Sequence, residues 1–219
     1  MAVKDFMTKR VVYVSPETTV AAAADIMREK GLRRLPVIEH DKLVGLITEG
    51  TMAEASPSKA TSLSIYEMNY LLNKTKVGDI MIKNVLTVSK YASLEDAIYI
   101  MLQNKVGVLP VVDNDQISGI ITDKDVFRAF LEISGYGQAG IRIGLEVTDT
   151  PRVLEKIANL IASENLNIER TIVAPKNDTV LRVELQVEGE IGIDRLKKVF
   201  VEAGFTVTEI AETEAKELD

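Results

Sequence analysis

Residues 5–48 of this chain recur at residues 79–122 without a gap, at a constant offset of 74 positions. Sixteen of the 44 aligned positions are identical, and both copies carry the triplet Leu-Pro-Val. An internal repeat constrains the architecture of a chain before any local propensity does. Two similar units in one chain are expected to pack about a pseudo-twofold axis. Two related clefts then form between them, each lined by both units.

Each repeat is predicted to fold as β-α-β-β-α. The β-branched runs Val11–Val14 and Val85–Val88 favour strands. A helix follows each run, because apolar residues recur at the spacing of one helix face. These residues are Val20, Ala23, Ala24 and Met27 in the first repeat and Leu94, Ala97, Ile98, Met101 and Leu102 in the second. The candidate N-caps of these helices are Thr18 or Thr19, and Ser93. A hairpin at 35–39 and 43–48, its copy in the second repeat, and a final helix after Thr48 and after Thr122 complete the units.

Beyond Gly135 the pattern changes to βαββαβ, the element order of a ferredoxin-like unit. The fold class is therefore α/β (α+β). The predicted segments are a first repeat at 1–56, an inserted helical segment at 57–76, a second repeat at 77–135, a glycine-rich hinge at 136–140, the βαββαβ unit at 141–210 and an acidic tail at 211–219. Ser64 and Glu67 in the insertion have capping-box spacing.

Composition excludes several classes of function. The chain has no cysteine, which rules out disulfides, thiolate nucleophiles and zinc–thiolate sites. The net charge of −7 argues against nonspecific binding to nucleic acid or anionic membranes, because both need a basic face. No apolar run approaches the length of a membrane span, and the first five residues are not a signal peptide. We expect a cytoplasmic protein.

The second repeat ends in Thr122-Asp-Lys-Asp125, a spacing that suits recognition of ribose and phosphate. A carboxylate at a helix start can accept hydrogen bonds from both ribose hydroxyls, and a hydroxyl three residues earlier can donate to a phosphate oxygen. Lys124 adds a positive charge between them. The same spacing also fits a capping box with Thr122 as N-cap. In the first repeat Thr51 replaces the aspartate, so we expect the two clefts to differ.

The two repeats resemble a tandem pair of CBS domains, which are regulatory modules that often bind adenosyl compounds. The paired Leu-Pro-Val strands and the ending at residues 119–125 carry this resemblance over about residues 1–133. Residues 141–210 resemble an ACT domain through their element order and through Asp149-x-Pro151-x-x-Leu154. The whole order, with the sequence at residues 64–72, is similar to the acetoin-utilization B family.

The CBS resemblance implies the other walls of the cleft that carries Thr122 and Asp125. By this resemblance they are Thr8, Val12, Leu32, Arg33 and Arg34 of the first repeat, and adenine is expected near Val12 and Ile120. An arginine fork suits a phosphate. The alternative for the two arginines is an exposed helix C-terminus, where cations are favoured. The second repeat has no charge at the matching place, so the arginines and the aspartate are implied for one site.

The ACT resemblance offers a second possible site. Many ACT domains resemble Asp-x-Pro-Gly at the first turn of a helix, where glycine lets an amino acid approach the backbone. Arg152 stands in place of that glycine, which argues against amino-acid binding. The simpler interpretation of residues 149–151 is a helix start with a cap and a proline in the first turn. We also expect a role in dimerisation, because an open sheet leaves edge strands to be covered.

The sequence does not predict an enzyme. His40 is the only histidine and lies in a polar turn, and no metal-ligand spacing, Walker A or Rossmann pattern is present. We therefore expect a sensor that requires no cofactor, binds an adenine nucleotide (AMP, ADP, ATP or a related adenosyl compound) and signals to the ACT region. The alternatives are an amino-acid sensor with the CBS pair as scaffold, and a structural oligomerisation protein or unrecognised enzyme. The expected partners are a second copy in a homodimer and an unidentified regulated protein, with no nucleic acid or membrane.

Overall fold

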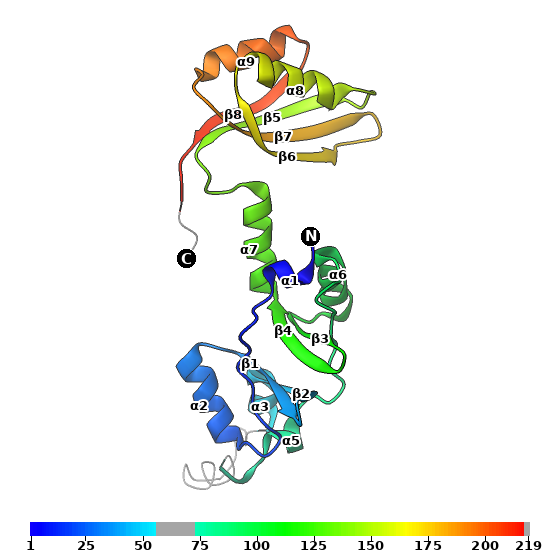
Figure 1. The fold of residues 1–219 in the computed structure, drawn as a ribbon, viewed down its shortest axis with the longest axis vertical. Helices are drawn as coiled ribbons and strands as arrows, with labels where there is room; N and C mark the ends of the chain where they lie inside the picture. Colours follow the sequence, from blue (N-terminus) through cyan, green and yellow to red (C-terminus); the bar gives the residue numbers. More distant parts are fainter. Residues whose placement is uncertain (56–72, 217–219) are drawn as a thin grey trace. The chain divides into compact units, whose positions relative to one another are not determined.

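The computed structural model describes residues 1–55 and 73–216 (Figure 1). The chain divides into two compact units, Met1–Phe127 and Arg128–Asp219. The predicted insertion, including the capping-box spacing of Ser64 and Glu67, lies almost wholly outside the described residues. The domain limits given above stay predictions.

The two repeats share one order of elements: a short helix, a longer helix, an antiparallel hairpin and a final helix. The first repeat contains α1 (Val3–Phe6), α2 (Val20–Lys30), β1 (Arg34–Glu39), β2 (Lys42–Thr48) and α3 (Glu49–Ala55), and the second contains α5 (Val77–Ile80), α6 (Leu94–Asn104), β3 (Val108–Asp113), β4 (Gln116–Thr122) and α7 (Asp123–Ser134). The predicted helices and hairpins are confirmed. The side chains of Thr19 and Ser93 cap α2 and α6 by accepting from the backbone N–H groups of Ala22 and Asp96.

The prediction of strands at Val11–Val14 and Val85–Val88 is wrong. Each run contains a single parallel bridge, from Val14 to Val37 and from Val88 to Val111. β-branched composition favours extended backbone, but a strand also needs a partner along its length. Each repeat is therefore α-α-β-β-α.

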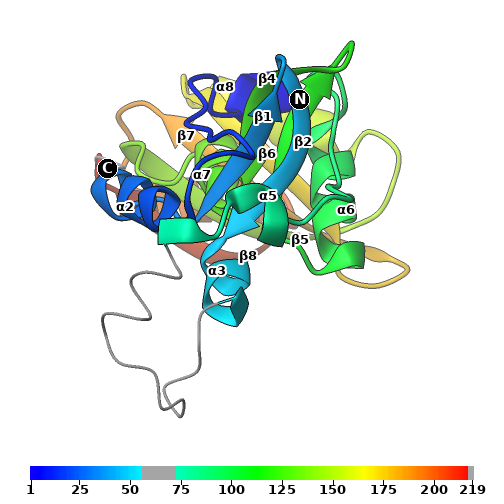
Figure 2. The same ribbon diagram turned by 90° about the horizontal axis from the view of Figure 1, so that it is seen from below.

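The short helices α1 and α5 are exchanged between the repeats. Val3 of α1 donates its backbone N–H to the carbonyl of Ala92 in the second repeat, at 2.9 Å. Val77 of α5 donates to the carbonyl of Thr18 in the first repeat, at 2.8 Å. Both valine side chains are fully buried. Figure 2 shows α5 beside the hairpin of β1 and β2. Each repeat thus needs a helix from the other to complete its core.

The apolar face predicted for α6 is wider than the face that the structure buries. Leu94, Ala97 and Met101 of α6 are buried, as predicted, whereas Leu102 is 72% exposed and Tyr99 is 65% exposed. Successive turns of a helix place residues i, i+3, i+4 and i+7 on one face, and Leu102 lies at its edge. The sequence pattern did not separate the edge of the stripe from its centre.

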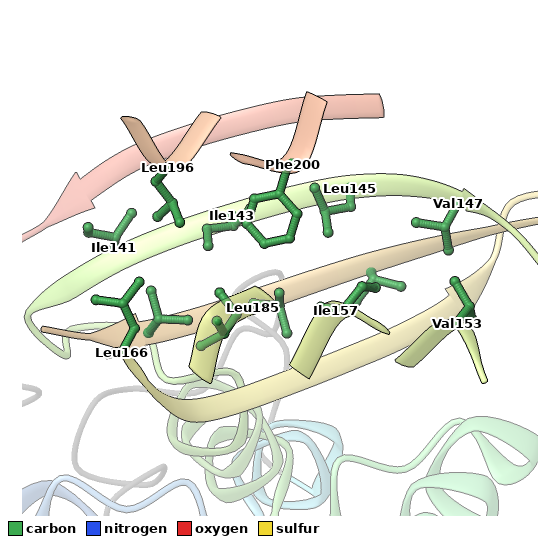
Figure 3. Packing of buried hydrophobic residues seen from close by; sticks show 13 residues of the cluster. Ile141, Ile143, Leu145, Val147, Val153, Ile157, Leu166, Leu185, Leu196 and Phe200 are labelled. Atoms are coloured by element: carbon green, nitrogen blue, oxygen red, sulfur yellow. The ribbon is translucent and has the colours of Figure 1, made fainter. Parts of the chain in front are cut away.

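The second unit has the predicted ferredoxin-like order. Its elements are β5 (Gly140–Thr148), α8 (Val153–Ser163), β6 (Asn167–Pro175), β7 (Val180–Glu188), α9 (Ile193–Glu202) and β8 (Thr206–Thr213). The antiparallel sheet has the order β6-β7-β5-β8. Both helices lie on one face of it and bury alternate residues of β5 and β7 (Figure 3). Leu196 and Phe200 of α9 are fully buried at the centre of this core.

The start of α8 differs from the prediction. Neither Asp149 nor Thr150 caps the helix with its side chain; the N-cap position is Arg152, whose side chain makes no capping bond. Arg152 has a left-handed backbone, with φ 69° and ψ 13°. Its guanidinium instead forms two hydrogen bonds, of 2.7 and 2.9 Å, with the carboxylate of Glu155 in the first turn. A residue without a Cβ adopts this backbone more easily.

Candidate functional site: the start of α7

The candidate site begins where the first repeat crosses to the second. Thr8 donates its N–H to the carbonyl of Ile120 at 2.9 Å, and Ile120 donates back at 3.0 Å. The equivalent pair in the other repeat is Ile82 with Leu46, at 2.9 Å in both directions. Two of the predicted site residues, Thr8 and Ile120, are therefore brought side by side by backbone pairing.

Two glycines permit this crossing. A Cβ atom at Gly119 would lie 2.9 Å from the carbonyl oxygen of Thr8, and one at Gly45 would lie 3.1 Å from that of Ile82. Real Cβ atoms almost never approach as closely as 2.9 Å, and a distance of 3.1 Å is tighter than most real Cβ contacts. The glycine that opens each Gly-x-Ile-Thr strand ending is thus explained by the backbone that passes over it.

Thr122 and Asp125 form a reciprocal cap at the start of α7. The backbone N–H and the hydroxyl of Thr122 both donate to Oδ2 of Asp125, at 2.8 and 2.7 Å. The N–H of Asp125 donates to the Thr122 hydroxyl at 3.4 Å. Oδ1 of Asp125 accepts no hydrogen bond within the described part of the chain. The capping interpretation is correct for one oxygen, and the other remains able to accept from a ligand.

The first repeat builds the same turn without a charge. The N–H of Thr48 donates to the hydroxyl of Thr51 at 2.9 Å, and the N–H of Thr51 donates to the hydroxyl of Thr48 at 3.1 Å. The Thr51 hydroxyl donates in turn to the carbonyl of Thr48 at 2.9 Å. Threonine therefore replaces aspartate as a cap, but it offers a ligand no carboxylate.

The two adjacent arginines reach different helices. Arg34 is half-buried and donates from Nη1 to the carbonyl of Gly107 at 3.3 Å, at the start of α7. Arg33 is 79% exposed, and its Nε lies 3.9 Å from Glu49, the first residue of α3. Successive side chains of an extended chain point to opposite sides. The structure thus brings Arg34 to the start of α7 and leaves Arg33 beside the start of α3.

The other predicted site residues differ in their exposure and in their contacts. The crossing segment is residues 8–14, which run from Ile120 of the second repeat to Val37 of the first. Val12 is 37% exposed in this segment, and Lys124 is exposed in the first turn of α7. Leu32 packs against the core of the first repeat, and its N–H donates to the carbonyl of Met27. Leu32 therefore has a structural role in this fold.

Sequence reasoning missed Gly107 and Asp123. The backbone N–H of Asp123 donates to the carbonyl of Gly107 at 3.2 Å, so Arg34 and the first residue of α7 share one acceptor. The available signal was the alignment of the repeats, which places Gly107 opposite Arg33. A glycine opposite a long side chain indicates a close approach by another group.

A second polar contact in this unit is structural. The hydroxyl of Ser89 donates to Oδ1 of Asp113 at 2.6 Å, and the N–H of Lys90 donates to Oδ2 at 3.2 Å. The hydroxyl bond, with the smaller contribution of Lys90, holds the pKa of Asp113 below its ordinary value. This contact ties the approach to α6 to the end of β3.

Among residues 1–55 and 73–216, no group of three or more metal-ligating side chains is present. Within the same ranges, no helix has the length and apolarity needed to cross a membrane. His40 is exposed in the turn between β1 and β2, with φ 48°.

The repeated order of elements and the exchanged helices are consistent with a CBS pair. The CBS domain model matches residues 3–58 and 77–132, about half of the chain, and the chain belongs to the CBS domain family. It is 37% identical over 156 residues to CBSX1, a chloroplastic CBS domain-containing protein of Arabidopsis thaliana, which covers 62% of this chain. The chain spans 66% of the length of CBSX1, and 46% and 25% of two further curated relatives.

Two solved structures are similar to the same region. CBSX2 of Arabidopsis thaliana in complex with AMP has a TM-score of 0.51 and 35% identity, with coverage of 60% of this chain and 97% of that one. An acetoin utilization protein (AcuB) of Vibrio cholerae has a TM-score of 0.53 and 26% identity, with coverage of 63% and 98%.

Proposed function

We propose that this protein is a non-catalytic regulatory sensor that binds an adenine nucleotide, or a related adenosyl compound, at the start of α7. The observation that carries the proposal is the asymmetry between the two repeats. Asp125 presents a free carboxylate oxygen where the first repeat presents only the hydroxyl of Thr51. Arg34 adds a cation whose acceptor, the carbonyl of Gly107, also meets the N–H of Asp123 at the start of α7. The relative CBSX2, whose structure contains AMP, supports the ligand class.

Roles follow from these positions. Asp125 accepts a hydrogen bond from one ribose hydroxyl through Oδ1. A second ribose hydroxyl takes the place of the Thr122 hydroxyl at Oδ2, and the Thr122 hydroxyl then donates to the ligand. Arg34, with Lys124 in the first turn of α7, attracts phosphate. Val12 and Ile120 supply apolar surface for adenine. No cofactor is part of this proposal.

Calorimetry on Asp125→Ala tests it. Loss of a charge-assisted acceptor is expected to weaken AMP binding by tenfold or more. Thr51→Ala is the matched control, because it removes the equivalent cap in the other repeat and is expected to leave AMP binding unchanged. Unchanged affinity in Asp125→Ala would reject the assignment of the site.

The proposal extends to signalling and assembly. The C-terminal unit, with its βαββαβ order, is proposed to be an ACT domain that receives the ligand state, and the protein is proposed to act as a cytoplasmic homodimer on an unidentified target. Exposed Tyr99 and Leu102 on α6 support self-association. The matching positions in the first repeat are Asp25 and Arg28, which form an ion pair at 2.6 Å. These charged side chains do not favour burial against a second copy.

An amino-acid sensor is the second candidate. Arg152 stands in place of the glycine of the ACT motif and has a left-handed backbone, and its guanidinium bonds to Glu155 in the first turn of α8. Glycine adopts a left-handed backbone most readily, so this turn has a conformation that a glycine would favour. A thermal-shift panel of adenine nucleotides and amino acids distinguishes the two candidates, since only a bound ligand raises the melting temperature.

A further inference from the structure

The side chains of Arg34 and Asp123 converge above Gly107. A Cβ atom at Gly107 would lie 2.7 Å from Oδ2 of Asp123 and 3.1 Å from Nη2 of Arg34. The two groups are close, yet they form no ion pair within 4.0 Å in this part of the chain. A carboxylate thus stands beside the cation that the proposed function assigns to phosphate.

Arg34 and the first turn of α7 together carry no net charge. Arg34 and Lys124 carry two positive charges, and Asp123 and Asp125 carry two negative ones. A phosphate monoester carries about −1.5 to −2 near neutral pH. One phosphate can pair with Arg34, but each further phosphate adds negative charge next to a carboxylate that no ligand group neutralises.

Resting on the proposed nucleotide function, we propose that Asp123 is a specificity-determining residue that limits the ligand to one phosphate. The cleft then prefers a nucleoside monophosphate over the di- and triphosphate. One additional like charge at about 4 Å in a water-like medium corresponds to roughly a fivefold change in binding constant. We expect AMP to bind at least that much more tightly than ATP.

A purely structural role for Asp123 makes a different prediction. An acidic residue in the first turn stabilises a helix through the macrodipole, so its loss would lower stability and weaken all nucleotides alike. The ratio of the AMP and ATP affinities separates the two roles, because only the charge next to the phosphates changes that ratio.

The test is calorimetry of AMP and ATP on the full chain, with EDTA present. Asp123→Asn retains the shape of the side chain and removes its charge, and it is expected to raise ATP affinity about fivefold relative to AMP. Glu49→Gln, at the matching position of the first repeat, is the control and is expected to leave the ratio unchanged. An unchanged ratio in Asp123→Asn, with both ligands still bound, would overturn the inference and leave the proposed function intact.

A second measurement needs no variant. Mg²⁺ neutralises part of the triphosphate charge, so saturating Mg²⁺ is expected to bring the ATP affinity of the unsubstituted protein toward that of AMP. ATP that binds as tightly as AMP in EDTA would reject a role for Asp123. Failure of the unsubstituted protein to bind either nucleotide would reject the proposed function itself, and the inference with it.

Discussion

The guanidinium of Arg34 in the first repeat donates a hydrogen bond to the backbone carbonyl of Gly107 in the second. Its neighbour Arg33 turns to Glu49 instead. We therefore predict that Arg34→Gln weakens AMP binding about tenfold, as expected for loss of a charge-assisted contact, and leaves adenosine binding unchanged. Titrations at two salt concentrations provide the check, because salt screens the phosphate contact. Arg33→Gln is the control; an equal loss in both variants would contradict the assignment to Arg34.

The glycines under the crossing segments are expected to be intolerant of side chains. Gly119→Val and Gly45→Val would each force a branched side chain against backbone of the other repeat, at a cost of about 1–3 kcal/mol. Urea denaturation measures this free energy. Gly50→Ala is the control, because Gly50 lies exposed in α3, where alanine is expected to stabilise by up to about 1 kcal/mol. If Gly119→Val were as stable as the unsubstituted protein, the segment that contains Thr8 would have moved to accommodate the side chain, and the prediction would be wrong.

The exposed pair on α6 provides a test of assembly. Tyr99→Asp with Leu102→Arg copies the ion pair that Asp25 and Arg28 form at the same positions of the first repeat. The fold already accepts this pair, so the double variant is expected to remain folded and to dissociate. Light scattering should give a mass near 24.1 kDa for the variant and a larger mass for the unsubstituted protein. A monomeric unsubstituted protein at micromolar concentration would reject the homodimer.

The left-handed backbone at Arg152 predicts an unusual order of stabilities. Arg152→Gly relieves the conformational cost and loses only an exposed ion pair, whereas Arg152→Ala loses the ion pair and retains the cost. We expect the glycine variant to be about 1 kcal/mol more stable than the alanine variant in thermal or urea unfolding. The reverse order would mean that the backbone at this turn relaxes.

The contact of Ser89 with Asp113 predicts a pH dependence. Because the pKa of Asp113 is lowered on folding, its contribution to stability is present above the ordinary pKa of the carboxyl and is lost as the pH falls through the lowered value. Asp113→Asn is expected to be less stable than the unsubstituted protein at pH 7, and the difference should narrow in acid below about pH 4. A constant difference from pH 7 to pH 3 would exclude this linkage.

Local signals in the sequence predicted local structure well. Thr19 and Ser93 are followed by residues with helical periodicity, and both cap their helices as expected. The βαββαβ order was readable because each of its elements alternates or repeats clearly between turn residues. The constant offset of 74 positions between the repeats also indicated that Thr51 and Asp125 occupy equivalent places, which the matching caps confirm.

The failures arose where a distant segment decides the structure. Val11–Val14 has strand composition, but only Val14 finds a strand partner, because the rest of the run crosses between the repeats. Asp149 looked like a cap, yet the chain makes a left-handed turn at Arg152 before α8 begins. The proximity of Arg34, Gly107 and Asp123 depends on how the repeats interlock, and no spacing within one repeat encodes it.

The exchange of α1 and α5 has a consequence for the order in which the chain can fold during synthesis. The first repeat lacks Val77 until the ribosome has passed it, so that repeat must wait for a later segment to close its core. The residues of α1 have already been synthesised when the hairpin of the second repeat emerges from the ribosome. Thr8 can then pair with Ile120. Until that moment the crossing segment, including Val12, has no neighbour from the second repeat. The proposed nucleotide site is therefore among the last features of the pair to form on the ribosome.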